Sequence, residues 1–223
     1  VDLNALNLDL NPGTLINDGT LALVSTETVQ IATMDTNSGT VWYYGGGSYT
    51  GLAVGNSYYS LLLDSSLAGL KTWTLNAALV CNGNLTVGSG NTATLDTGNF
   101  AITIGGNFSV GAGGTFTVGS SRVTFTGAAT GTSDITPGGD AFYDLEVAAG
   151  GNSARLQESI TVNRDVILTS GTLNANNLNI SVARNWTNTA GSLTAGTGTV
   201  SFITAAAAVI SGSTTFNNFS CSV

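Results

Sequence analysis

Histidine is absent from this sequence of 223 residues, and it contains only 2 cysteines and 2 prolines. Without histidine, Ser–His and Cys–His catalysis are excluded. Zinc and redox metals also lack their usual ligands, and we expect neither a metal nor another cofactor. No apolar run of about 20 residues is present, and no signal peptide is visible, so we expect no membrane insertion.

Charged side chains are also scarce. They make up 8% of the residues, with a net charge of −8 and a pI near 4.1. The 5 basic residues form no run, so a nucleic-acid partner is not expected. Gly, Ser, Thr and Asn supply the polar surface instead. Low charge, abundant Thr, Ser and Asn, and no histidine favour a processed secreted protein. We therefore expect an extracellular or cell-surface location.

What the chain has in abundance is short apolar pairs with one residue between them. Between positions 79 and 127 these pairs are Leu85 and Val87, Ile102 and Ile104, Phe108 and Val110, Phe116 and Val118, and Val123 and Phe125. Alternation of period two predicts strands with one buried face. Turn residues follow each pair, so a strand begins roughly every 6 to 8 residues, more often than in a sandwich.

The sequence also repeats over a longer distance. Thr14-Leu15, Thr94-Leu95 and Thr172-Leu173 recur roughly 80 residues apart, and similar strands follow each of them. Such a period fits tandem β-sandwich domains or a β-solenoid with three or four coils per unit. The density of strands and the absence of linkers favour the solenoid. The prediction is an all-β, right-handed-type parallel β-solenoid of almost three units, forming one elongated domain over residues 1–223 with a strand-like arm at 1–11.

Asparagine is expected to stabilise the corners of this solenoid. Hydrogen bonds run from coil to coil in such a fold, so like residues stack upon one another. The turns Gly83-Asn84-Leu85, Gly98-Asn99-Phe100 and Gly106-Asn107-Phe108 are candidates for corners with side-chain ladders.

One family resemblance follows from these repeats. From Thr14 onward the chain resembles the repeats of large secreted bacterial surface proteins, of the filamentous-adhesin or autotransporter-passenger type, most clearly in GNLTVGSGNTATLDTGNFAITIGGNFSVGAGGTFTVGSSRVTFTG. The resemblance implies a stalk or fibre that extends adhesive or structural surfaces from cells. It implies no catalytic residues.

An enzyme hypothesis depends on acidic side chains. The densest group is Asp134, Asp140, Asp144 and Glu146. Asp144 and Glu146 are one strand period apart and could face outward together, as the carboxylate pair of a glycoside hydrolase would. A solvated strand face explains them as well, and we favour it, so we expect no enzyme. Gly138-Gly139-Asp140 is similar to the opening of a calcium-binding repeat but occurs once.

The alternative function that we keep open is a carbohydrate-binding or polysaccharide-degrading β-helix.

Aromatic residues are concentrated between positions 42 and 59. Alternate members of a strand must point outward, which makes Trp42, Tyr44 and Tyr58 candidates for an interface. Exposed Tyr and Trp are favoured at interfaces, so a surface glycan or a neighbouring subunit are both possible partners. Packing in the core and at corners is the competing interpretation.

The two ends of the chain suggest self-assembly. The apolar residues of the opening segment alternate in two runs offset by one position, as in a strand with a bulge: Val1, Leu3, Leu6, Leu8 and Leu10. Such a strand is a poor free edge. We expect it to pair with Phe216 and Phe219 of another copy, giving a head-to-tail homopolymer. The alternative is that coils of a longer chain cover the ends.

The last expectation concerns the cysteines. Cys81 and Cys221 align with apolar inward positions, so each should be a buried small hydrophobe. Coil spacing would place them at least roughly 25 Å apart. That distance exceeds the reach of a disulfide, so no bridge between them is expected within one chain.

Overall fold

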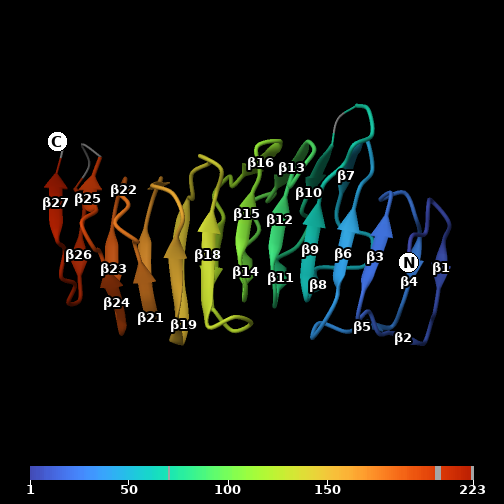
Figure 1. Cartoon of the computed structure of the whole chain (residues 1–223), viewed down its shortest axis with the longest axis horizontal. Coiled ribbons are helices and arrows are strands. Elements are labelled where there is room, and N and C mark those ends of the chain that lie inside the picture. Colours follow the sequence, from blue (N-terminus) through green and yellow to red (C-terminus); the bar gives the residue numbers. More distant parts are fainter. Residues whose placement is uncertain (70, 204–206, 222–223) are drawn as a thin grey trace.

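The computed structural model of the chain describes residues 1–69, 71–203 and 207–221. They form a parallel β-solenoid of about 10 turns without a helix, as predicted. The strands stack along one long axis, and β1 and β27 lie at opposite ends of it (Figure 1). Within the described residues, no helix has the length and apolarity needed to cross a membrane.

Successive strands occupy three faces of the solenoid in turn. Face 1 consists of β3 (Thr20–Leu23), β6 (Thr40–Tyr43), β9 (Ser60–Leu63), β12 (Leu85–Val87), β15 (Phe108–Val110), β18 (Thr132–Thr136), the second parts of β19 (Asp144–Leu156) and β21 (Val166–Asn174), and β24 (Gly191–Thr194). Face 2 consists of β2 (Thr14–Leu15), β5 (Thr33–Met34), β8 (Ser57–Tyr58), β11 (Leu79–Cys81), β14 (Ile102–Ile104), β17 (Arg122–Phe125), the first parts of β19 and β21, β23 (Trp186–Asn188) and β26 (Ile210–Ser211). Face 3 consists of β1 (Leu8–Asp9), β4 (Val29–Gln30), β7 (Ser48–Thr50), β10 (Thr72–Thr74), β13 (Ala93–Asp96), β16 (Gly114–Thr117), β20 (Ile160–Val162), β22 (Ile180–Val182), β25 (Thr199–Phe202) and β27 (Asn218–Cys221).

The core is a set of apolar columns that run through the coils. In face 1, Leu61 pairs with Leu85, and Leu85 pairs with Phe108. The apolar pairs predicted between positions 79 and 127 are all buried, and each outward residue between the two members of a pair is less buried. Burying one face of every short strand is what fixes these strands in register, because a slip of one residue would expose the apolar set.

The repeat of roughly 80 residues does not stack on itself. Its three leucine anchors lie on three different faces: Leu15 on face 2, Leu95 on face 3 and Leu173 on face 1. The chain passes through faces 3, 2 and 1 in turn, and the repeat is one strand shorter than a whole number of coils, so each copy begins one face earlier. The stacking unit is a single coil, as in the pairing of Thr20 with Thr40 and of Thr40 with Ser60.

The predicted asparagine corners are confirmed. The side-chain Oδ1 of Asn84 accepts a hydrogen bond from the backbone N–H of Asn107 at 2.8 Å, and Asn107 accepts one from Asp134 at 2.9 Å. Asn99 accepts one from Ser120 at 2.9 Å. Each side chain therefore satisfies a backbone donor of the next coil at a place where the strand ladder is interrupted.

The opening segment differs from the single bulged strand that we expected. Asn4 and Ala5 have φ values of 44° and 65°, so a turn separates the two apolar runs. Asp2 pairs in parallel with Ala22, and β1 pairs with β4. The carboxylate of Glu27 accepts backbone N–H groups of Ala5, Val24 and Ser25 at 2.7–3.1 Å. Residues 1–11 are thus part of the first coil.

Candidate functional site: the two ends of the solenoid

The N-terminal end leaves strand edges and core uncovered. Among the described residues, β1 and β2 each pair with one strand only, so each has one free edge. Val1, Leu6 and Ile16 are 86%, 71% and 70% exposed. A hollow of about 230 Å³ opens here, and its lining is mostly apolar: Val1, Leu3, Leu8, Leu15, Ile16, Asn17 and Leu21.

The C-terminal end is uncovered in the same way. Within the described part of the chain, β26 pairs only with β23, and β27 pairs only with β25. Phe219 is 51% exposed, and three more large apolar residues of the last strands are exposed: Ile203, Val209 and Ile210. The ring of Phe216 joins this surface to the core, with centroids 5.2 Å from Trp186 and 5.5 Å from Phe219.

The two ends differ in charge. The first 35 residues carry five acidic side chains and no basic one: Asp2, Asp9, Asp18, Glu27 and Asp35. Residues 185–223 carry no charged side chain. Two N-terminal ends would therefore repel each other, whereas an N-terminal and a C-terminal end would not.

Most of the predicted interface residues lie at the ends, but three do not. Leu10 is 37% exposed at the N-terminal end, near Leu3 and Leu8, which line the hollow. Trp42 and Tyr44 lie on the side of face 1 near the N-terminal end, where Trp42 pairs with Ala22 and Ala22 pairs with Asp2. Tyr58 was wrongly predicted to be exposed: it is fully buried, and its hydroxyl group donates to the carbonyl oxygen of Gly55 at 2.6 Å.

Tyr58 is buried because the turn before β8 places it inward, opposite a second buried tyrosine. Its hydroxyl lies 3.1 Å from that of Tyr43. Burial raises the pKa of Tyr43 to about 12 and that of Tyr58 well above the usual value. Both hydroxyls stay protonated and hold the coil together rather than serving an interface.

Four exposed apolar residues at the ends were not predicted. All four carry a readable signal, because each follows or precedes another apolar residue: Ile16 after Leu15, Ile203 after Phe202, and Val209 with Ile210. Two consecutive residues of a strand cannot both point into the core. Ile203 is exposed because it follows Phe202, the buried last residue of β25.

The cysteines show the same contrast. Both are free thiols, and Cys81 is fully buried as predicted, which raises its pKa. Cys221 was predicted to be buried and is exposed. It pairs with Phe202 in a buried column, but no described strand covers it from the other side. The two residues lie on different faces and on strands that are far apart in the stack.

The acidic group does not form an outward carboxylate pair. Asp144 is 2% exposed, and its carboxylate accepts the Nε–H of Arg164 at 2.6 Å, with a second contact from Nη2. Glu146 does face outward, where it contacts Arg122 Nη1 at 3.3 Å and accepts from Thr169 Oγ1 at 2.7 Å. The expectation that Asp144 and Glu146 face outward together is therefore wrong.

These charges form an ion-pair ladder between coils. Arg164 also contacts Asp165 at 3.3 Å, and Arg184 contacts Asp165 at 3.3 Å. The hydrogen bond to Asp144 raises the pKa of Arg164, whose guanidinium lies 4.8 Å from the ring centroid of Tyr143. The arginines thus lie between acidic side chains that stack at one corner. This arrangement stabilises the fold and does not resemble the carboxylate pair of a glycoside hydrolase.

Asp140 is also engaged in holding neighbouring coils together. Its Oδ2 accepts the backbone N–H of Phe116 at 2.6 Å. In the part of the chain that the structure describes, no three His, Cys, Asp or Glu side chains gather as metal ligands would.

Comparison with known proteins gives no relative. No family model, curated protein or solved structure matches the chain.

Proposed function

We propose that this solenoid is a structural module, a subunit or segment of an extracellular fibre or surface stalk of the filamentous-adhesin type. It assembles head to tail by β-strand pairing. The observation that supports the proposal best is the pair of uncovered ends, each with free strand edges and exposed apolar residues. Exposed edges of this kind pair readily with another chain.

The proposed joint continues an existing strand ladder. β27 of one copy lies beside β1 of the next on face 3. Phe219 and its neighbours cover the apolar hollow that Leu8 and Leu15 line. Because the two surfaces are different and do not close on themselves, repeated joints produce an open filament.

The remaining surface fits a passive extracellular structure. The outward positions of the strands are mostly Thr and Ser, as at Thr86, Thr103 and Thr187. Such side chains keep the sides of a fibre polar without stacking like charges from coil to coil. This is our reason for favouring a structural role over an enzyme and for excluding nucleic acid as a partner.

The experiment that tests the proposal compares two exposed phenylalanines. Phe219 is 51% exposed at the C-terminal end, and Phe100 is 38% exposed at a corner in the middle of the chain. Neither Phe219→Glu nor Phe100→Glu places a charge in the core. Size-exclusion chromatography with light scattering and electron microscopy should show filaments of constant width for the unmodified chain and for Phe100→Glu.

Phe219→Glu should weaken association at least about tenfold, because it places a carboxylate against an acidic end. A chain that stays monomeric at high concentration would contradict the proposal. Equal assembly of the two variants would contradict the proposed joint.

A further inference from the structure

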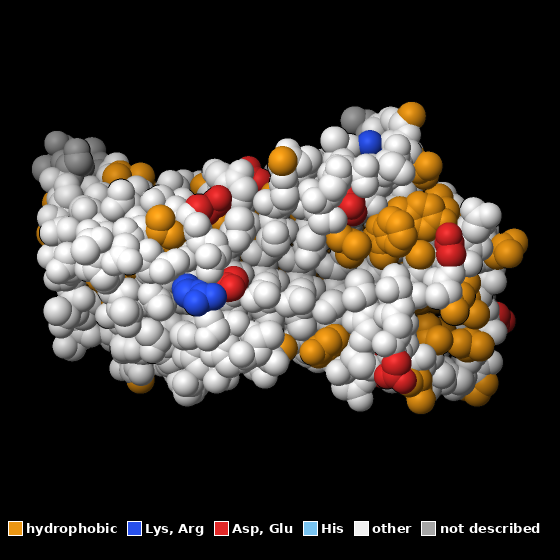
Figure 2. Space-filling view, viewed as in Figure 1, with side chains coloured by type: hydrophobic (Ala, Val, Ile, Leu, Met, Phe, Trp, Pro, Cys, Tyr) orange, Lys and Arg blue, Asp and Glu red, His pale blue; other side chains and the backbone are white. Residues whose placement is uncertain are grey.

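Two aromatic side chains form a fixed platform on the side of face 1, near its N-terminal end. The rings of Trp42 and Tyr44 lie 5.2 Å apart at an angle of 45°. Trp42 Nε1 donates to the carbonyl oxygen of Asp64 at 2.8 Å, and the Tyr44 hydroxyl donates to Asp2 Oδ1 at 2.8 Å. Both side chains remain partly exposed. Figure 2 shows hydrophobic side chains gathered over the N-terminal part of the molecule, whereas the C-terminal half of this view is mostly polar.

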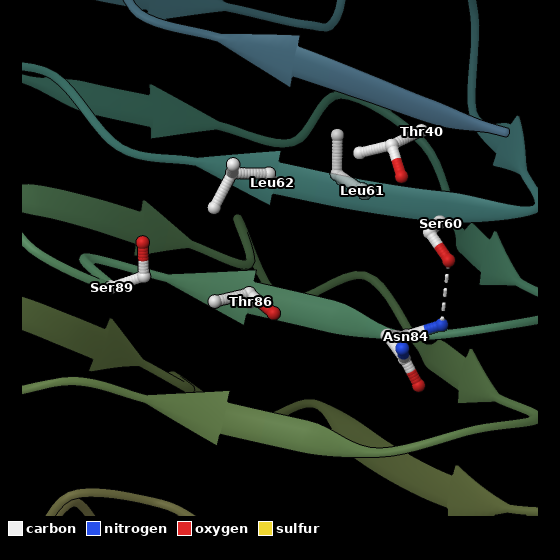
Figure 3. Close-up of a pocket in the computed structure, with 7 residues that line it drawn as sticks. All are labelled: Thr40, Ser60, Leu61, Leu62, Asn84, Thr86 and Ser89. Carbon is white, nitrogen blue, oxygen red and sulfur yellow. Dashed lines mark hydrogen bonds between the residues drawn. The ribbon is translucent and has the colours of Figure 1, made fainter. Parts of the chain in front are cut away.

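A hollow of about 310 Å³ lies on the same face, and Figure 3 shows the residues that line it. Its lining comes from three successive coils: Thr40, Ser60, Leu61, Leu62, Asn84, Thr86 and Ser89. Leu62 is the strand partner of Trp42, so the apolar surface continues from the platform into the hollow. The hollow therefore has an apolar wall on one side and hydroxyl and amide groups on the others.

Several of these polar groups are free to bind a ligand. Among the described residues, the hydroxyls of Thr40 and Thr86 and the side-chain nitrogen of Asn84 have no hydrogen-bond partner. The Oδ1 of Asn84 is held by the backbone of Asn107, which fixes the direction of the amide. Two donors or acceptors on adjacent coils are spaced by about 4.8 Å, close to the length of one sugar unit.

The hollow has no charged side chain in its lining. The nearest carboxylate, that of Asp64, already accepts hydrogen bonds from Ser89 Oγ at 2.9 Å and from the backbone N–H of Asn91 at 2.8 Å. An ionic ligand would gain no partner here. A neutral ligand with apolar faces and many hydroxyl groups would match both the aromatic platform and the polar lining.

We propose that this site binds a neutral polysaccharide, lying across the coils of face 1 with one sugar ring against Trp42 and its neighbours in the hollow. The site does not depend on the proposed joint, because it lies on the side of the solenoid. In a filament it would recur once per subunit, so weak single sites would add up to strong attachment.

The intrinsic fluorescence of the protein provides the test. Trp73 and Trp186 are fully buried, so a change caused by an added oligosaccharide reports on Trp42. The probes are the neutral oligosaccharides cellohexaose, xylohexaose, mannohexaose and chitohexaose, with oligogalacturonate as the charged comparison. At least one neutral probe should give a saturable change, and oligogalacturonate should not.

Two matched variants locate the site. Thr86→Arg fills the hollow, whereas Thr103→Arg adds the same side chain at an outward position of face 2. We expect Thr86→Arg to weaken binding at least about tenfold and Thr103→Arg to leave it unchanged. If Thr86→Arg misfolds by circular dichroism, Trp42→Leu with calorimetry replaces it. Failure of all neutral probes, equal binding of oligogalacturonate, or an equal effect of both variants would overturn the proposal. Light scattering of the same samples tests assembly separately.

Discussion

The middle coils and the terminal coils are built from the same kinds of residues, yet only the middle ones bury them. Leu85 has Leu61 on one side and Phe108 on the other, and it is fully buried. Phe219 has a strand partner, Val200, on one side and none among the described residues on the other, and it is 51% exposed. In a solenoid, each coil packs its apolar residues against the coils on either side. An alternating apolar pattern therefore buries a residue only where a neighbouring coil covers it on both sides.

The largest effect should come from removing a ring in the middle. Phe108 is 1% exposed and packs against the rings of Phe116, Phe125 and Phe142. Phe108→Ala should lower the free energy of unfolding by about 3–5 kcal/mol, because it leaves a cavity. Phe219→Ala should cost less than about 1 kcal/mol in the monomer. Urea unfolding of both variants measures the difference, and equal losses would mean that the terminal coil is covered in solution.

The second effect concerns the ion-pair ladder. Asp144→Ala removes the buried carboxylate that accepts hydrogen bonds from Arg164, and we expect a loss of about 2 kcal/mol, because Arg164 is partly exposed and keeps Asp165 as a partner. Glu146→Ala removes a more exposed partner of Arg122 and should cost less than about 1 kcal/mol. Thermal unfolding in parallel checks the order. A smaller loss for Asp144→Ala than for Glu146→Ala would show that the ladder does not stabilise the fold.

The third effect concerns the asparagine corners. Asn107→Ala deprives the backbone N–H of Asp134 of its acceptor, which should cost about 1 kcal/mol. Thr103→Ala, at an outward position between two coils, is the control and should be nearly neutral. Hydrogen exchange at the amide of Asp134 gives a local reading, and unchanged protection in Asn107→Ala would refute the role of the corner.

The smallest effect is a pH dependence in face 1. A hydrogen bond from Arg155, at 2.8 Å, lowers the pKa of Asp134. The pair therefore adds stability above the unfolded-state pKa of Asp134, and this contribution is lost as the pH falls through the lowered folded-state value. Asp134→Asn should remove that part of the acid dependence, so in thermal melts the variant is slightly less stable than the unmodified chain near neutral pH and the difference disappears in acid. An acid limb that is identical in both proteins would contradict this assignment.

Local features of the fold could be predicted from the sequence. The face of the solenoid on which each strand lies could not. Apolar pairs such as Leu85 and Val87, and corners such as Asn84, depend on a few neighbouring residues. The face on which a strand lies depends on every preceding turn. Partners are 20 residues apart for Thr20 and Thr40 but 27 apart for Phe108 and Ile135, so small uncertainties accumulate.

The same reason explains the errors at the candidate site. The pattern around Tyr58 permits an inward or an outward side chain, and only the turn before β8 decides. Cys221 occupies an inward column, so its sequence environment resembles that of Cys81. Cys221 is exposed because no described strand lies beyond β27. The residues around Cys221 do not show whether another strand covers it.

The most direct test of head-to-tail assembly uses the native thiol of Cys221. In the proposed joint it lies on β27 beside β1 of the next copy, within the Cα distance that a disulfide requires. The two strands are at opposite ends of one molecule (Figure 1), so a link between them must join two chains. Cys81 is buried and should not react.

Leu8→Cys should therefore give, under mild oxidation, a ladder of disulfide-linked species that extends beyond dimers on a non-reducing gel. Leu8→Cys combined with Cys221→Ser should lose the ladder, and Thr103→Cys should not produce one at the same rate. A Leu8→Cys protein that yields only monomers and dimers, at concentrations where filaments are seen, would contradict the head-to-tail joint.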